Sequence, residues 1–447
     1  GYYTDAVIEA VVQDLMKEYG YKKDFAEQKL MTSGYRIYTV MDVTMQTTLE
    51  RMFADPATFA YGNAKEEDLP QAAMVICDYE GNILALVGGR GEKTTSRGFN
   101  LATQAKRPFG STIKPLSIYG PAFEKDLITW STLMEDKPTL WKDKKDELAG
   151  NPPDYPNNYN HRFEENPMTI IDAIKVSKNT IPVQLCELMG PETVYEFMTT
   201  KLHFSNMVAS AADIGSHSMA LGGADTTLID LTAAYQIFGN NGYYTPPKLY
   251  SQVLDAEGKV ILDNPSSDTK QVIPADTAYV LNRALWQVVN GGGSGARAKL
   301  SQWETVGKTG TSDDRKDLLF AGCTPYYTAV IRYGHNDNTV ISNSVEGSHI
   351  QAWKKVMEEI LKGKNPATFD LDSSGVEQRE YCTESGLLAT SQCPAKLTGY
   401  YKKDFLPEYC SHENLSAPEE EDPFEDDPQP PSSPDPSPWD DEDLGFE

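Results

Sequence analysis

The sequence predicts an α+β fold in which one antiparallel sheet packs beside a layer of helices. Short strand patterns occur near residues 72–87 and again near residues 304–333, while the periodicity between them is mainly helical. Strands contributed by both ends of such a sequence come together in one sheet. The 447 residues suffice for two or three domains, or for one large α/β unit with appendages.

The first strands of the sheet are expected to form a hairpin. Apolar Ala72–Cys77 and Ile83–Val87 are separated by five residues that include Asp, Gly and Asn, which are typical of turns. Before them, residues 1–33 are expected to form a helix and a connecting segment, and Gly34–Met41 alternates as a strand does.

The helical layer is expected between the two groups of strands. Its predicted helices are Ser111–Glu124, Thr169–Val176, Thr180–Met189, Glu192–Leu202 and Thr227–Phe238. Residues 136–162 lack apolar periodicity, so we expect a long ordered loop or an insertion near the site. An exposed hairpin follows at Leu249–Leu254 and Lys259–Leu262, and then a helix at Ala275–Val289.

Strand patterns return after the flexible, glycine-rich residues 291–295. The predicted strands are Glu304–Thr311, Asp317–Cys323 and Tyr326–Tyr333, and a helix at His349–Leu361 closes the unit.

The charge of the chain is acidic and unevenly distributed. The formal net charge is -26, and residues 418–447 contain many acidic residues and prolines without any Lys or Arg. We expect this tail to be disordered. Nucleic-acid binding is not expected, because it requires a basic face to meet the phosphates.

The ends of the sequence carry no membrane or export signal. No run of eighteen apolar residues occurs, and the first residues lack a signal-peptide pattern, so we expect the given chain to be soluble. An amphipathic helix pattern begins at Ala6 with nothing before it to pack against. We therefore expect that an upstream region is missing.

The six cysteines form two groups. Cys77, Cys186 and Cys323 lie in apolar runs and are expected in the core. Cys382, Cys393 and Cys410 lie in a polar region with His412 nearby, but no Cys-x-x-Cys pair is present, so neither a metal nor another cofactor is predicted. In an oxidising compartment a disulfide between two of these three is expected instead.

The most informative motif is Ser111-Thr-Ile-Lys114, which follows Gly110 at the start of a predicted helix. Residues three apart share one face of a helix, so Lys114 can reach the Ser111 hydroxyl and act as its base. The same pattern recurs at Ser267–Lys270, but among turn-forming residues typical of a solvated loop.

Two further elements, Ser177-Lys178-Asn179 and Lys308-Thr309-Gly310-Thr311, follow in this order and complete a catalytic set. Lys114 must be neutral to accept a proton, and burial together with the nearby cation of Lys308 would lower its pKa. The Asn179 amide can hold the Lys114 amine and a substrate amide, and Ser177 can pass a proton to the leaving group.

The element Lys308-Thr309-Gly310-Thr311 is predicted to bind substrate along a strand. Gly310 leaves room for a peptide, while Lys308 and the two threonine hydroxyls can bind a terminal carboxylate. The backbone N–H groups of Ser111 and Thr311 are candidates for an oxyanion hole. By contrast, Asp313-Asp314 is interpreted as a solvated turn.

With these motifs in order, the chain resembles the transpeptidase region of class A, bifunctional penicillin-binding proteins. The resemblance covers roughly residues 34–363 and includes four further stretches: Ala72–Ile76 with Gly81–Arg90, Phe99–Pro108, Ala220–Gly223 and Gly307–Ser312. Two departures, at Arg107–Gly110 and at Leu318–Phe320, touch no catalytic atom but bear on acceptor selectivity.

The resemblance implies a β-lactamase-like fold, with a five-stranded antiparallel sheet beside an all-helical subdomain. It implies a D,D-transpeptidase in which Ser111 attacks the bond between two terminal D-alanines of a peptidoglycan stem. An amine of a neighbouring stem then forms the cross-link. β-Lactam antibiotics would acylate the same serine. The implied setting is the extracytoplasmic face of the bacterial plasma membrane among the cell-wall synthesis machinery, anchored by an N-terminal segment absent from this chain.

We therefore expect four parts: a connector at 1–33, a penicillin-binding transpeptidase domain at 34–365, a Cys-containing extension at 366–415 and the acidic tail at 416–447. The nearest rival function is that of a D,D-carboxypeptidase or a β-lactamase-like hydrolase, in which Glu164 or Glu165 could activate water. The sequence also admits a β-lactam sensor, which would bind the antibiotic and signal, or an inactive scaffold.

Overall fold

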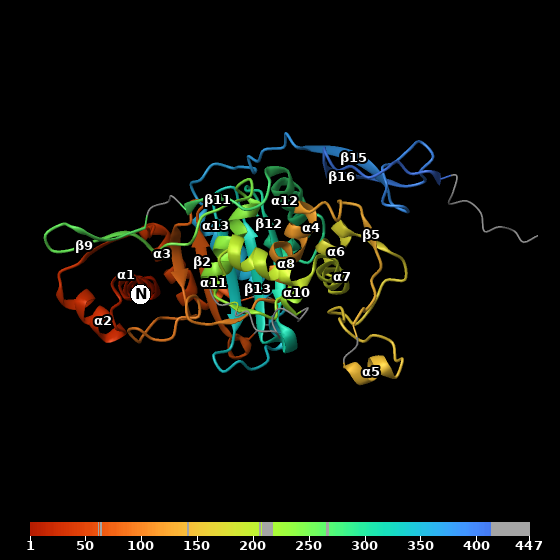
Figure 1. The fold of residues 1–447 in the computed structure, drawn as a ribbon. Coiled ribbons are helices and arrows are strands. Elements are labelled where there is room, and N and C mark those ends of the chain that lie inside the picture. Colours follow the sequence, from red (N-terminus) through yellow and green to blue (C-terminus); the bar gives the residue numbers. More distant parts are fainter. Residues whose placement is uncertain are drawn as a thin grey trace, which may run out of the picture. The chain divides into compact units, whose positions relative to one another are not determined.

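The centre of the computed structural model is a five-stranded antiparallel sheet with strand order β12-β13-β14-β2-β3 (Figure 1). Its strands are β2 (Gln71–Cys77), β3 (Ile83–Val87), β12 (Val306–Thr311), β13 (Asp317–Cys323) and β14 (Thr328–Gly334). Strands from the two ends of the sequence therefore meet, as predicted. The structure describes residues 1–60, 62, 65–140, 143–204, 207, 218–264 and 268–412.

Alternate residues of the sheet enter two different cores. On one face Leu318, Phe320 and Met74 pack with helices α3 (Val43–Ala54) and α13 (Ser348–Ile360). On the other face Leu319 and Val75 pack with α11 (Leu228–Ala234) and α12 (Ala275–Asn290). Burial on both faces explains why β2, β3 and β13 are almost continuously apolar.

The helical layer follows the predicted segments closely, with differences in helix type. Its members are η3 (Gly110–Ile113), η4 (Pro115–Tyr119), α4 (Gly120–Glu124), α5 (Lys144–Leu148), α6 (Ile170–Val176), α7 (Thr180–Met189), α8 (Pro191–Glu196), η5 (Phe197–Lys201), α10 (Ser218–Leu221) and η6 (Tyr235–Phe238).

The segment expected as one helix from Ser111 to Glu124 changes its hydrogen bonding twice. It is a 3-10 helix up to Ile113, a π-helix from Pro115 and an α-helix from Gly120. Pro115 and Pro121 lack the N–H that a regular α-helix requires, so the local spacing of hydrogen bonds adjusts.

The N-terminal region contains more structure than the sequence predicted. Two helices, α1 (Tyr2–Tyr19) and α2 (Lys23–Thr32), replace the expected helix and connecting segment. Later segments cover the apolar face of α1, and the Tyr3 hydroxyl donates to the carbonyls of Ile83 and Leu249 at 2.7 and 3.0 Å. Strands β1 (Arg36–Thr39), β9 (Tyr250–Leu254) and β10 (Val260–Asp263) form a second sheet.

A C-terminal hairpin, which the sequence did not predict, consists of β15 (Val376–Cys382) and β16 (Lys396–Lys402). It packs on the domain, because the Trp130 and Tyr400 rings lie 5.1 Å apart and the Ser131 and Tyr401 hydroxyls share a hydrogen bond of 2.7 Å. Residues Gly1–Cys410 form one compact unit. The predicted disordered tail lies outside the described residues.

Short elements complete the fold. The small strand pairs are β4 (Arg107–Pro108) with β7 (Asp225–Thr226), β5 (Leu133–Met134) with β6 (Met168–Thr169), and β8 (Tyr243–Tyr244) with β11 (Lys270–Gln271). The single-turn helices are η1 (Pro56–Thr58), η2 (Glu66–Asp68), η8 (Ala296–Ala298), η9 (Asp313–Arg315) and η10 (Asn343–Val345). Among the described residues, no helix combines the length and apolar character needed to cross a membrane.

Candidate active site

Ser111 stands at the start of η3, where the chain comes very close to strand β12. Gly110 has φ 52, and a Cβ atom there would lie 2.2 Å from the Thr311 carbonyl oxygen. The Gly110 N–H donates to the carbonyl of Gly222 at 3.2 Å, which holds this turn from the other side. The close approach brings Ser111 and Thr311 into the lining of one cleft.

Lys114 is fully buried below Ser111, and its amine already has three acceptors. Lys114 Nζ donates to the Lys178 carbonyl at 2.8 Å, to Asn179 Oδ1 at 2.6 Å and to the Ser177 carbonyl at 3.3 Å. Within the described part of the chain, no hydrogen bond joins Lys114 Nζ to the Ser111 hydroxyl. Burial, and then the charge of Lys308, lower the pKa of Lys114 well below its ordinary value.

Ser177 ends helix α6 in a left-handed conformation, with φ 63 and ψ 45. Such a backbone is costly for a residue with a side chain and is held only by its surroundings. Here it places the Ser177 carbonyl at Lys114, while the Ser177 hydroxyl accepts a hydrogen bond of 2.6 Å from Lys308 Nζ. Ser177 thus contacts both lysines, as the predicted proton relay requires.

Lys178, the middle residue of Ser177-Lys178-Asn179, belongs to a network of hydrogen bonds that sequence reasoning missed. Its amine lies 2.5 Å from Asp136 Oδ2 and 3.0 Å from Glu164 Oε1. Burial alone would raise the pKa of Asp136, but hydrogen bonds from Asn158, Lys178, Thr180 and the Glu164 N–H hold it below its ordinary value.

The same network fixes Asn179. The Asn179 backbone N–H donates to Asn158 Oδ1 at 3.0 Å, and its side-chain amide donates to the Asn157 carbonyl at 2.7 Å. With its amide nitrogen held in this way, the Asn179 oxygen points to Lys114. The segment 136–162, which we expected to be an ordered loop or an insertion near the site, therefore holds Asn179 in place.

Lys308 lies on β12, one of the two edge strands of the sheet, and is fully buried. Burial lowers the pKa of Lys308 to about 7. Its neighbour Thr309 shares a hydrogen bond of 2.8 Å with Ser294, whose N–H donates to the Lys175 carbonyl at 3.2 Å. The glycine-rich turn therefore links the end of α6 to the edge of β12.

Gly310 is needed for a reason other than the one the sequence suggested. A Cβ atom at Gly310 would lie 2.7 Å from the Phe109 carbonyl oxygen and from Thr112 Cγ2. The space beside this glycine is therefore filled by the segment that carries Ser111, and the missing side chain serves the packing of η3 on β12.

These residues open on a cleft of about 800 Å³. Its lining includes Ser111, Ser177, Asn179, Thr309, Gly310 and Thr311. Lys114 and Lys308 lie beneath it. The structure thus brings every predicted site residue together.

The rim of the cleft adds residues that sequence reasoning missed. Arg315 joins Tyr159 and Glu346 by hydrogen bonds of 2.7 and 2.5 Å, and all three residues line the cleft. No motif marks these residues in the sequence, because they meet only through the fold.

The remaining residues that the sequence singled out have different places. Glu164 pairs with Lys178, and among the described residues neither Glu164 nor Glu165 lines the cleft. Asp314 carries most of its side chain in solvent, as expected of a turn. Ser267, the serine of the second Ser-x-x-Lys pattern, lies outside the described residues.

Three of the cysteines lie in the core, as expected, and the other three lie close together. Cys77, Cys186 and Cys323 are fully buried in the core, as predicted. Cys382, Cys393, Cys410 and His412 form the one group in the described part of the chain whose side chains are placed as metal ligands are.

Comparison with protein families matches residues 71–352 to the penicillin binding protein transpeptidase domain and residues 372–414 to the penicillin-binding protein 1A C-terminal domain. Among curated proteins, penicillin-binding protein 1A of Clostridium tetani is 32% identical over 412 residues, covering 88% of this chain and 51% of the relative. Penicillin-binding protein 1A of Clostridium acetobutylicum is 32% identical over 379 residues, covering 83% and 45%. The chain thus spans about half the length of these relatives.

Solved structures show the same fold. Penicillin-binding protein 1A from Haemophilus influenzae has a TM-score of 0.71 at 19% identity, covering 91% of this chain and 76% of that one. The PonA1 protein from Mycobacterium tuberculosis in complex with penicillin V has a TM-score of 0.65 at 23% identity, covering 82% and 95%. Both support the fold that the resemblance implied, a five-stranded antiparallel sheet beside helices.

Proposed function

Because the chain belongs to the family of the penicillin binding protein transpeptidase domain, we propose that it is a D,D-transpeptidase that cross-links peptidoglycan stem peptides through an acyl group on Ser111. The observation that carries the proposal is the placement of Lys114. Its amine is fully buried, and within the described residues it pairs with no carboxylate. A lysine in such a place is easily made neutral, and a neutral lysine is a base.

The hydrogen bonds of Lys114 suggest how it changes from acid to base. A protonated amine has three donors, which match its three acceptors here. A neutral amine has two donors and one lone pair. The bonds to Lys178 and Asn179 are the shorter ones, so the neutral form gives up the donor of the 3.3 Å contact to Ser177. To take the Ser111 proton, the amine must then turn its lone pair from the Ser177 carbonyl toward Ser111.

Acylation then follows from the positions of the two serines. Ser111 Oγ attacks the carbonyl carbon between the terminal D-alanines, and its proton passes to Lys114 Nζ. The N–H groups of Ser111 and Thr311 bind the resulting oxyanion. As the tetrahedral intermediate collapses, the proton taken up by Lys114 passes through the Ser177 hydroxyl to the leaving D-alanine amine, and Lys308 orients that hydroxyl by its bond of 2.6 Å.

Substrate binding is assigned to the edge of β12. The terminal carboxylate is bound by the hydroxyls of Thr309 and Thr311, which line the cleft beside Gly310, and is attracted by the charge of Lys308 buried beneath them. β-Lactams carry a comparable carboxylate and acylate Ser111 in the same way. An amine from a second stem peptide enters the cleft of about 800 Å³ and takes the acyl group. The polymer lies outside the plasma membrane, so we place this activity on its extracytoplasmic face, with the cell-wall synthesis machinery as partner.

Hydrolysis by the same serine is the second candidate. It would need a carboxylate that activates water, but of the two acidic candidates of the loop Glu164 is paired with Lys178, and among the described residues neither Glu164 nor Glu165 lines the cleft. This pairing favours transfer to an amine over transfer to water.

The test uses a stem peptide that ends in two D-alanines, with and without an amine acceptor. We expect release of D-alanine and, with acceptor, a cross-linked product; Ser111→Ala should abolish both. Ser267→Ala is the matched control, because it alters the second Ser-x-x-Lys pattern. Equal activity of Ser111→Ala and the native chain would contradict the proposal. Release of D-alanine without any cross-linked product would favour a carboxypeptidase.

A further inference from the structure

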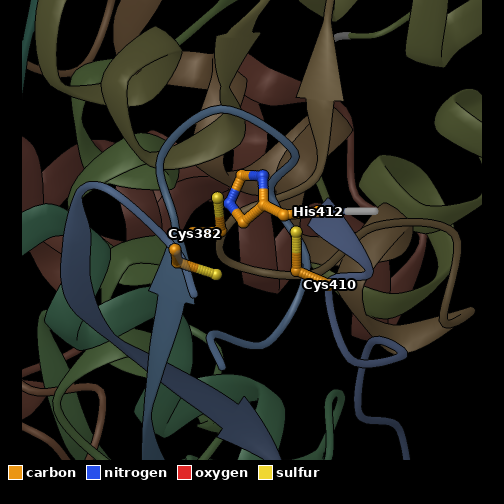
Figure 2. Close-up of side chains that lie close together, drawn as sticks. Cys382, Cys410 and His412 are labelled. Atoms are coloured by element: carbon orange, nitrogen blue, oxygen red, sulfur yellow. The ribbon is translucent and has the colours of Figure 1, made fainter. Parts of the chain in front are cut away.

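The C-terminal hairpin carries a cluster of potential metal ligands that has no part in the proposed reaction. Figure 2 shows the side chains of Cys382, Cys410 and His412 turned toward a common point. The ligand atoms of these residues and of Cys393 all lie within 4.8 Å of one another. The three cysteines are buried, with relative exposures of 0, 7 and 4% for Cys382, Cys393 and Cys410.

Backbone pairing rather than sequence spacing brings the three cysteines together. Cys382 is the last residue of β15, and its N–H donates to the Leu387 carbonyl at 2.8 Å. Cys393 lies in the loop that returns to β16. After β16 the chain crosses back, and the Cys410 N–H donates to the Leu388 carbonyl at 2.8 Å. His412 follows two residues later, so its covalent link to Cys410 keeps it near the cluster.

Each sulfur also accepts hydrogen bonds from the surrounding loops. The Thr390 N–H donates to Cys393 Sγ at 3.2 Å, and the Ser385 hydroxyl donates to Cys410 Sγ at 3.1 Å. Backbone N–H groups of the turn after Cys382 donate to its sulfur. Donors of this kind stabilise thiolates and orient metal ligands. Leu387 and Ala389 pack against the three cysteines and keep the cluster apolar.

We propose that Cys382, Cys393, Cys410 and His412 together bind one structural Zn²⁺ ion. Three thiolates and one imidazole are a ligand set of structural zinc sites, and a site whose four ligands all come from the protein has no open position for catalysis. Zn–S bonds of about 2.3 Å require sulfurs about 3.8 Å apart in a tetrahedron. Ligand atoms within 4.8 Å of one another reach that geometry through small side-chain rotations.

Two features favour zinc over a disulfide. A disulfide would use two of the cysteines and leave the third sulfur beside His412, whereas a metal uses all four side chains. In addition, a metal that joins the end of β15, its loop and the segment after β16 would fix all three. The expectation of no metal rested on the missing Cys-x-x-Cys pair; the spacing here is Cys-x10-Cys-x16-Cys-x-His.

The experiment measures metal on the whole chain, purified under reducing conditions without a histidine tag. We expect about one equivalent of bound Zn²⁺. Replacement by Co²⁺ should give the thiolate charge-transfer and strong visible bands of a tetrahedral site. Cys382→Ser and Cys410→Ser should each lose the metal, while Cys186→Ala, which alters a cysteine of helix α7, should keep it. His412→Ala should weaken Zn²⁺ binding and change the Co²⁺ visible bands.

Each outcome decides for or against the site. A native chain that binds no Zn²⁺ or Co²⁺ and has two of these cysteines in a disulfide would overturn the proposal. So would a metal that remains bound after Cys382→Ser and Cys410→Ser are combined. If a serine variant does not fold, the Co²⁺ spectrum of the native chain still decides. Acylation of Ser111 by a penicillin is measured in parallel, and its failure would count against the proposed function only.

Discussion

Replacing Gly310 by alanine tests how Ser111, the proposed nucleophile, is positioned. The added Cβ would lie 2.7 Å from both the Phe109 carbonyl oxygen and Thr112 Cγ2, and 3.1 Å from the Thr112 nitrogen. Ordinary van der Waals contact begins at 3.4 Å. Since two of these neighbours are backbone atoms flanking Ser111, no side-chain rotation removes the overlap. The segment of η3 and strand β12 must move apart.

The required movement sets the size of the effect. Overlaps of several tenths of an ångström in a packed region cost about 1–3 kcal/mol in the free energy of unfolding. A displacement of about 1 Å between a nucleophile and its binding groups lowers a rate roughly 100-fold. We therefore expect Gly310→Ala to fold, to melt a few degrees lower and to be acylated by a labelled penicillin about 100-fold more slowly.

Gly98→Ala is the matched control, because its Cβ would meet nothing closer than 3.5 Å. It should leave both the melting temperature and the acylation rate unchanged. The reasoning would be refuted if Gly310→Ala were acylated as fast as Gly98→Ala.

Three further predictions concern the charged groups of the site. Asp136→Asn leaves buried Lys178 without its closest carboxylate, so it should lower the free energy of unfolding by about 3 kcal/mol and slow acylation. The control Asp370→Asn alters an exposed residue and should change neither quantity. Because folding lowers the pKa of Asp136, the native chain should exceed Asp136→Asn in free energy of unfolding by the full amount above the unfolded pKa of about 3.9. This difference should be lost as the pH falls through the folded pKa. Denaturation measured at a series of pH values checks it. The second-order rate constant of acylation should fall at low pH, because Lys114 gains a proton, and at high pH, because Lys308 loses its proton above about pH 7. Lys308→Arg should remove only the fall at high pH. A rate constant that does not change with pH would contradict both roles.

The sheet could be predicted because burial on both faces leaves a direct mark on the sequence. Residues such as Leu318 and Leu319 enter opposite cores, and both must be apolar. The short polar helix α2 has only one buried residue, Ala26, so periodicity could not reveal it. The π-helical turn at Pro115 depends on how the segment packs, which a propensity does not contain.

The site was predictable where chemistry requires particular residue types. A serine with a nearby lysine, a second serine with an asparagine, and a lysine on a strand can be found in the sequence. The buried partner Asp136 could not be found, because acidic residues are common in loops and only the fold shows which one meets Lys178. The sequence grouped Cys382, Cys393 and Cys410 with His412 but could not show that their side chains meet, since backbone pairing at Leu388 joins residues far apart in sequence.

The most direct test of the central claim is to locate the acyl group. The native chain is incubated with penicillin, digested, and the modified peptide identified by mass spectrometry. We predict one penicilloyl adduct, on Ser111, that is absent from Lys114→Met although this variant still folds. An adduct on any other residue, or an adduct formed at the native rate in Lys114→Met, would contradict the assignment of Ser111 as acyl carrier and Lys114 as its base.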